Sequence, residues 1–291
     1  MTTSTTILEL ADRMWAGEAD LVHEHHPVQY RHPQAEEIAE GLQVYIGIAS
    51  ANTVDTGDGL VMLDTGHQLD IKPLYDGVRA WRPMSPLAGA VYSHHHVDHV
   101  FGTKMFEEEA TKNGWARPTV YAHEELPQHF DRYLKTRGWN SAINRRQFAI
   151  HLPQFQWPDW YRYPDVTYRD QLTFTRGDLT FELRHARGET DDATWTWCPE
   201  KKILHPGDLF IWAVPNAGNP QKVQRYVSDW AVALREMAAL GPEIMLAGHG
   251  LPIVGRDRIV AALTDTADLL QSLEDQTLAL MNQGVTLDQV L

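Results

Sequence analysis

Short apolar segments separated by turn residues recur along the chain from Leu42 onward. Two-residue alternation or a short β-branched run predicts a strand, and apolar residues three or four positions apart predict a helix. The predicted strands are 42–48, 51–55, 60–64, 87–92, 119–122, 171–175, 179–185, 193–198, 202–204 and 243–247. The predicted helices are 71–81, 102–113, 124–136, 229–240 and 256–282. This pattern indicates an α/β chain with two β-rich halves, which is typical of a sheet packed on a sheet with helices outside.

The same pattern divides the chain into three regions. Residues 1–40 form a polar N-terminal segment, residues 41–257 form the main domain, and residues 258–291 continue a C-terminal helix. Within the main domain, residues 137–165 are rich in Trp, Tyr, Pro and Asn and predict a structured insertion, since long loops in compact domains are usually functional. The C-terminal helix carries an apolar face, so a homodimer through this helix is expected.

Composition excludes several classes of protein. The net charge is −14 and no basic stripe compensates for it, which argues against a nucleic-acid partner. The apolar runs are too short to cross a bilayer, and residues 1–15 lack the pattern of a secretory signal. We therefore expect no membrane span and a cytoplasmic location. The single cysteine, Cys198, excludes a scaffold held by internal disulfides.

The fifteen histidines of the chain include one dense cluster. His94, His96, Asp98 and His99 stand within six residues, directly after the predicted strand 87–92. In an extended segment alternate side chains share a side, so His94 and His96 face one way and the intervening His95 faces the other. Imidazole and carboxylate are good zinc ligands, and the spacing suits two neighbouring ions.

Other acidic and histidine residues also stand at ends of predicted strands. Glu189 follows the strand 179–185, Asp208 follows 202–204, and His249 follows 243–247, each beside a glycine. Asp64 ends the strand 60–64 in an Asp-Thr-Gly turn. Taken alone, an acidic residue or a histidine beside a glycine is ordinary in a turn.

Together these motifs resemble the metallo-β-lactamase-fold hydrolases over residues 42–255. The resemblance implies a four-layer αββα sandwich and two zinc ions per chain. It implies that His94, His96 and Glu189 bind the first ion, that Asp98, His99 and His249 bind the second, and that Asp208 bridges both. Asp98 and Asp208 would be the catalytic residues among these ligands, and Asp64 would orient the ligand loop from behind.

One ligand position departs from the commonest pattern of that family. The residue after Gly188 is usually histidine, and here it is Glu189, which is similar to the alkylsulfatase branch. That branch carries an arginine for the sulfate group after the bridging acid. No clear match exists here, although Gln221, Lys222 and Arg225 lie in the corresponding stretch. Alkylsulfatases also continue into further domains, and the resemblance places the last residues of this sequence within the expected connection to them.

Several further residues are candidates for substrate contacts. The aromatic insertion could line an apolar pocket, so we expect a small-molecule substrate that is anionic and carries an apolar tail. The candidates for substrate binding are Asn140, Asn144, Arg145, Trp212 and Asn216.

The resemblance thus implies a dinuclear zinc hydrolase that cleaves alkyl or aryl sulfate esters with a metal-bound hydroxide. A hydrolase of another ester, a lactone or a β-lactam would use the same ligands. Iron-based redox chemistry and a catalytically silent binding protein are the alternatives from other classes. The intact His94-x-His96 pattern and the complete ligand set favour hydrolysis.

Overall fold

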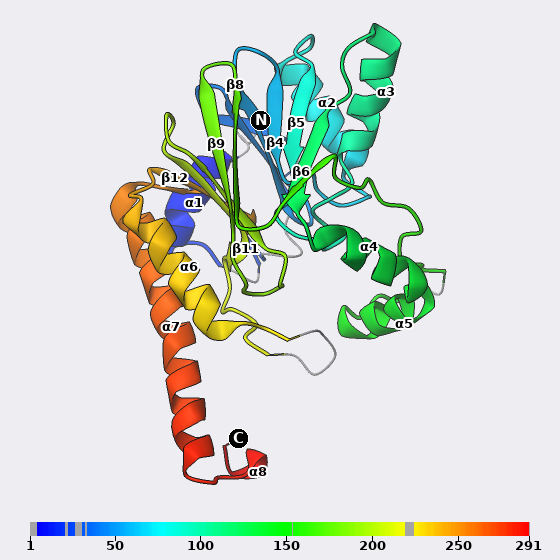
Figure 1. Cartoon of the computed structure of the whole chain (residues 1–291). Coiled ribbons are helices and arrows are strands. Elements are labelled where there is room, and N and C mark those ends of the chain that lie inside the picture. Colours follow the sequence, from blue (N-terminus) through cyan, green and yellow to red (C-terminus); the bar gives the residue numbers. More distant parts are fainter. Residues whose placement is uncertain are drawn as a thin grey trace.

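The computed structural model describes residues 5–20, 23–26, 31–32, 34–152, 154–218 and 224–290. Two β-sheets face each other in this part of the chain, and helices cover both outer faces (Figure 1). The predicted αββα sandwich is therefore confirmed.

The first sheet contains seven strands in the order β1 to β7 among the described residues. Its first four strands are antiparallel neighbours, and β4 to β7 run parallel to one another. The strands are β1 (Glu36–Ala39), β2 (Leu42–Ile46), β3 (Ser50–Asp55), β4 (Leu60–Leu63), β5 (Leu87–Val91), β6 (Thr119–His123) and β7 (Val166–Tyr168).

The second sheet has the order β13-β12-β11-β10-β9-β8. Its strands are antiparallel to their neighbours except for the parallel pair β11 and β12. The strands are β8 (Gln171–Arg176), β9 (Leu179–His185), β10 (Thr194–Cys198), β11 (Ile203–Ile211), β12 (Ile244–His249) and β13 (Ile253–Val254).

The helices form the outer layers and one long extension. Figure 1 shows α2 and α3 outside the first sheet, α6 and α7 outside the second, and the end of α7 projecting from the body. The helices are α1 (Ile7–Trp15), α2 (Ile71–Trp81), α3 (Thr103–Asn113), α4 (Leu126–Lys135), α5 (Arg137–Gln147), α6 (Val227–Ala239), α7 (Arg256–Asn282) and α8 (Leu287–Val290).

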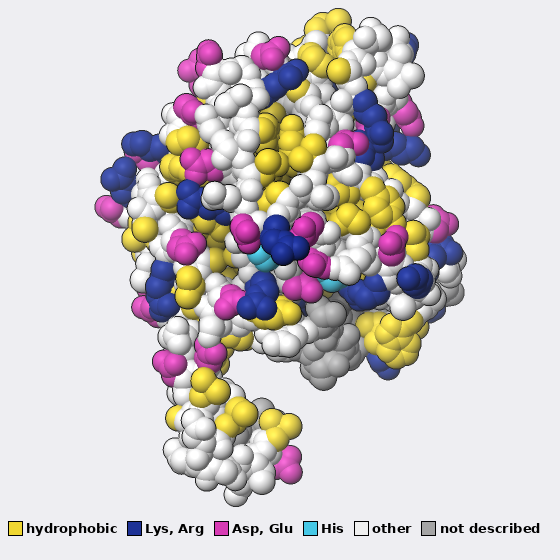
Figure 2. Space-filling view, viewed as in Figure 1, with side chains coloured by type: hydrophobic (Ala, Val, Ile, Leu, Met, Phe, Trp, Pro, Cys, Tyr) yellow, Lys and Arg dark blue, Asp and Glu magenta, His cyan; other side chains and the backbone are white. Residues whose placement is uncertain are grey.

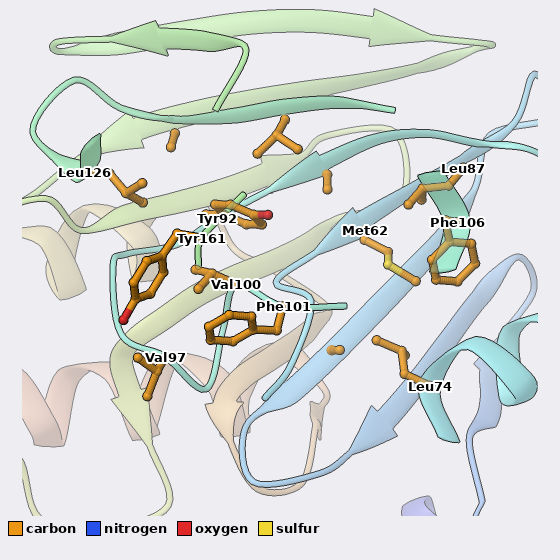
Figure 3. Close-up of a cluster of buried hydrophobic side chains, with 14 of the residues drawn as sticks. Met62, Leu74, Leu87, Tyr92, Val97, Val100, Phe101, Phe106, Leu126 and Tyr161 are labelled. Carbon is orange, nitrogen blue, oxygen red and sulfur yellow. The ribbon is translucent and has the colours of Figure 1, made fainter. Parts of the chain in front are cut away.

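Three buried apolar clusters hold these layers together. One cluster, which includes Met62, Leu74 and Phe106, lies between the first sheet and its helices (Figure 3). A second fills the space between the sheets, and a third joins the second sheet to α6 and α7. Because every layer buries a face against the next, the strand ends at the edge of the sandwich are held in fixed positions.

Three local details differ from the sequence pattern. The strand β11 runs on to Ile211, so Asp208 lies within a strand, at an irregularity in its pairing with β12, rather than in a turn. The insertion begins with the helix α5, which its polar composition concealed. The N-terminal segment supplies the helix α1 and the strand β1, which pairs with β2 across residue 40.

Candidate metal centre

The histidine side chains in the turn after β5 point in two directions. The rings of His94 and His96 have centroids 4.5 Å apart, and those of His94 and His99 are 4.4 Å apart. His95 instead has its Nδ1 atom 2.9 Å from Asp192 Oδ1, on the other side of the turn. The alternation expected from the sequence is therefore observed.

A first group of possible ligand atoms comes from His94, His96, Glu189 and Asp208. One ligand atom from each of these residues lies within 4.8 Å of the others. His96 Nδ1 is 3.7 Å from Glu189 Oε2, and His94 Nε2 is 3.7 Å from Asp208 Oδ2. Three segments that are distant in sequence thus meet at one point.

A second group comes from Asp98, His99 and His249. Asp98 Oδ2 lies 3.2 Å from His249 Nε2 and 3.8 Å from His99 Nε2. Asp208 reaches this group too, with Oδ1 3.4 Å from His99 Nε2 and Oδ2 3.4 Å from His249 Nε2. The Asp208 carboxylate therefore lies between the two groups, as expected of a bridging ligand.

The donor atoms of both groups fit divalent metal ions. Ligands about 2.1 Å from a tetrahedral ion are about 3.4 Å from one another, and the separations above are 3.2–3.8 Å. Within the described chain, the buried atoms His94 Nε2, His99 Nε2 and Asp208 Oδ1 have no hydrogen-bond partner. Buried polar atoms are normally satisfied, so a bound cation explains this arrangement.

The other ring nitrogen of three histidines is held by the surrounding protein. His249 Nδ1 is 2.7 Å from the carbonyl oxygen of Ile48, His99 Nδ1 is 2.7 Å from Asp64 Oδ2, and His94 Nδ1 is 2.9 Å from Ser93 Oγ. Such contacts fix the tautomer and the ring orientation of a ligand histidine. All three Nε2 atoms consequently face the shared space around Asp208.

Asp64 supports the ligand turn from beneath. Its buried carboxylate accepts hydrogen bonds from the amide and the hydroxyl of Ser93, both at 2.7 Å, and from His99. His205 Nε2 is also 3.1 Å from Asp64 Oδ2. Burial alone would raise the pKa of Asp64, but His99 and His205 hold it well below the usual range. A charged Asp64 can therefore orient His99 without being a ligand itself.

Charge attracts a cation to this point of the fold. Burial, followed by the charge of His99, lowers the pKa of His94 to about 4, so its ring is neutral and able to bind a metal. Burial would also lower the pKa of His249, yet Asp208 and Asp98 raise it to about 10. The carboxylates thus favour positive charge here, which a metal ion supplies once it displaces the proton.

Glu189 has a buried cationic partner in Arg225. Arg225 Nη2 lies 2.9 Å from Glu189 Oε1, and Arg225 Nη1 donates to the carbonyl oxygen of the same residue. Burial and the nearby Asp208 raise the pKa of Glu189 to about 8, whereas Arg225 opposes this change. Arg225 therefore holds in place the candidate ligand Glu189.

A separate network anchors the ligand turn from the side of α4. The ring of His95 stacks on that of His129 at 4.0 Å, and His129 Nε2 is 2.7 Å from Asp191 Oδ1. Arg132 of α4 is 3.4 Å from His95 Nε2. His95, His129 and Asp192 lie close enough together to form a metal site, but the guanidinium of Arg132 would repel a cation.

The predicted substrate contacts are spread over different places. Asn140 Nδ2 donates to Thr136 Oγ1, and the buried Asn144 donates to the carbonyl oxygen of Asn140, so both make bonds near or within α5. Arg145 is exposed on the same helix. Asn216 is also exposed, while Trp212 is half-buried, donates to the carbonyl oxygen of Leu251, and lines a cavity of about 370 Å³ against α1. The substrate-binding roles of these five residues stay predictions. Gln221 and Lys222, which were considered for the sulfate group, lie outside the described residues.

Sequence reasoning missed several residues that support the centre. His205 has no motif of its own, and Asp192 and Ser93 are ordinary residues beside stronger signals. The positions of Asp192, next to the Gly-Glu pair, and of Ser93, directly before the histidine motif, are weak signals in the sequence. Nothing local identifies Arg225 as the partner of Glu189, because 36 positions separate them.

Comparisons with known proteins identify the family of this chain. The sequence model of the Metallo-beta-lactamase superfamily matches residues 44–249. A linear primary-alkylsulfatase from Pseudomonas sp. is 26% identical over 82% of this chain and 48% of its own length. An (R)-specific secondary-alkylsulfatase from Pseudomonas sp. is 24% identical over 87% of this chain and 42% of its length. The chain spans about half the length of these curated relatives.

Solved structures share the fold at low sequence identity. The inverting sec-alkylsulfatase Pisa1 from Pseudomonas sp. superposes with a TM-score of 0.76 at 21% identity, over 89% of this chain and 44% of that one. A metallo-beta-lactamase from Pontibacter korlensis gives a TM-score of 0.54 at 19% identity, over 82% of this chain and 98% of that one.

Proposed function

This chain belongs to the metallo-beta-lactamase superfamily, and we propose that it is a metal-dependent hydrolase with two zinc ions at the centre built around Asp208. The observation that carries this proposal is the convergence of two ligand groups on one carboxylate. His94, His96 and Glu189 would hold one ion, and Asp98, His99 and His249 the other. Two such ions would activate water at neutral pH and attract an anionic ester group.

The protein contributes orientation and charge to this chemistry. Asp64 holds His99 in place, and the carbonyl group of Ile48 holds His249. Arg225 holds Glu189. Asp98 and Asp208 belong to the catalytic set because their carboxylates border the space that a reacting group would enter. Preorganised groups of this kind need no rearrangement during the reaction.

Sulfate esters are the substrates that we favour. Glu189 replaces the histidine that the family resemblance leads us to expect at this position, and the curated relatives named above are alkylsulfatases. Asn140, Asn144, Arg145, Trp212 and Asn216 remain our candidates for contacts with an anionic head and an apolar tail. Another ester, a lactone or a β-lactam is the alternative, because the same metal ligands would serve these substrates.

A substrate panel on metal-analysed protein tests this function. Purified chain should contain about two zinc ions and should release product from alkyl or aryl sulfates. His96→Ala should abolish turnover and retain the fold, whereas His23→Ala, on an exposed side chain, should behave as the parent. Turnover of lactones with inactivity on every sulfate would contradict the sulfatase assignment, and one bound iron would contradict the zinc assignment.

The expectations about assembly and location are part of the same proposal. None of the helices in the described ranges is long and apolar enough to cross a membrane. We propose a cytoplasmic enzyme that dimerises through the C-terminal helix, where Leu273, Leu278 and Met281 are exposed. Sedimentation analysis tests the dimer, and a monomer at all concentrations would contradict it. We also propose that the chain divides into an N-terminal segment (1–40), a catalytic domain (41–257) and a C-terminal helix (258–291).

A further inference from the structure

The surface of α4, α5 and the residues up to 152 differs in charge from the rest of this acidic chain. Residues 126–152 contain five Lys or Arg residues and one acidic residue, whereas the whole chain has a net charge of −14. Lys135, Arg145 and Arg146 are exposed, and no described residue forms an ion pair with them. We call residues 126–152 the α4–α5 surface. Its positive charge is available to an outside partner.

The same surface exposes large apolar side chains. Trp139 is 65% exposed, Phe148 is 53% exposed and Leu152 is 55% exposed. Other aromatic residues of the insertion, such as Trp157 and Tyr161, are buried in the core instead. The exposed residues are therefore not needed to fill the insertion, and large apolar groups exposed beside basic ones are available for an interaction.

Cationic and apolar residues share one side of α5. Trp139, Ala142 and Arg146 are three and four positions apart, so they share a helix face. Ala142, Arg145, Arg146 and Ile150 line a shallow groove of about 340 Å³. Figure 2 shows hydrophobic and basic side chains side by side over α4 and α5, on a face that also shows histidine atoms.

We propose that the α4–α5 surface docks on the surface of an anionic lipid bilayer. The guanidinium groups of Arg145 and Arg146 would contact the headgroups, and Trp139, which shares a helix face with Arg146, would enter the interfacial region. Basic residues beside Trp and Phe on a helix are typical of interfacial binding. The acidic remainder of the protein weakens this attraction little, because charges beyond about 10 Å are screened at ordinary ionic strength.

This docking would place the candidate metal centre close to the bilayer. α4 supplies His129 and Arg132, which contact His95 in the ligand turn, so the surface and the turn belong to neighbouring elements. An amphiphile in the bilayer would therefore be held near the centre. The proposal goes beyond the proposed hydrolysis and does not depend on which ester is cleaved.

Co-sedimentation of the full chain with vesicles tests this inference without any activity measurement. The parent protein should bind vesicles that contain phosphatidylglycerol, bind pure phosphatidylcholine vesicles much more weakly, and dissociate as salt rises. Arg145→Gln with Arg146→Gln should weaken binding about 30-fold, because each basic residue contributes independently at an anionic surface. Trp139→Ser should weaken it about tenfold through lost apolar contact.

Matched substitutions elsewhere separate this surface from general charge. Lys72→Gln with Lys112→Gln removes the same charge from α2 and α3, and Met84→Ser removes an exposed apolar side chain. These variants should bind as the parent does, and circular dichroism should show the parent fold for all of them. Equal binding to both vesicle types, equal losses in test and control variants, or binding to polyglutamate but not to vesicles would each overturn the proposal.

Discussion

At the scale of single residues, the centre depends on side chains that touch the candidate ligands without belonging to them. Asp64 accepts hydrogen bonds from both Ser93 and His99. Arg225 forms an ion pair of 2.9 Å with Glu189. Such supporting contacts decide how firmly a ligand is held, and replacing them typically changes metal affinity rather than removing the site.

Replacing Asp64 with asparagine tests the support beneath the turn. Asp64→Asn removes a buried charge that three groups contact, so we expect a loss of about 3 kcal/mol in unfolding free energy. Chemical denaturation measures this loss. Asp58→Asn, at an exposed carboxylate, should change stability little. Equal stability of the two variants would contradict the role given to Asp64.

Replacing Arg225 tests the support of Glu189. Arg225→Met leaves the Glu189 carboxylate without its cation, so the metal affinity should fall about 10- to 100-fold. Competition with a chelator measures this change, and Arg225→Lys should retain part of the affinity. The exposed Arg187 pairs with Asp229 and offers the control Arg187→Met. Unchanged metal affinity in Arg225→Met would show that Glu189 is held by other means.

At the scale of elements, the centre requires β11 to lie very close both to the turn after β5 and to β12. Gly207 adopts a φ of 55°, and a Cβ atom there would lie 2.5 Å from Ser93 Cβ. A Cβ atom on Gly248 would lie 2.6 Å from the carbonyl carbon of Gly207 and would press on Asp208 Oδ1. The glycines beside Asp208 and His249 therefore allow the two strands to bring these side chains together.

A methyl group at this contact should disturb both the sheet and the centre. Gly248→Ala should destabilise the protein by about 2 kcal/mol or more and lower its metal content, because neither Asp208 nor the backbone of Gly207 can move freely. Gly138→Ala is the control, since open space surrounds this position and alanine favours a helix. Thermal melting and metal analysis measure the outcome. Native behaviour of Gly248→Ala would contradict the close approach.

At the scale of the whole molecule, the centre joins the two sheets. His94 and Asp98 follow β5 of the first sheet, whereas Asp208 and His249 belong to β11 and β12 of the second. A bound ion would therefore link the two halves of the sandwich. Removing the ions with a chelator should lower the thermal midpoint, because an ion present at roughly a thousand times its Kd adds about 4 kcal/mol to the free energy of unfolding. Added zinc should restore the midpoint. No shift with chelator would contradict a structural contribution of the metals.

The sequence predicted those parts of the molecule that depend on local order. The spacing from His94 to His99 and the alternation that turns His95 away are properties of six adjacent residues. The extension of β11 past Asp208 was not predicted, because it depends on pairing with β12. The contact of His205 with Asp64 joins residues 141 positions apart, and no local pattern carries such information.

The contact of His95 with Asp192 and His129 has a consequence for sequence variation. The turn that carries the candidate ligands also carries a residue bound to α4 and to the segment before β10. A change at His95 alone would leave Asp192 buried without its partner, which is costly. Among relatives of this chain, residues 95, 129 and 192 should therefore change together or not at all, even though none of the three belongs to the proposed ligand set.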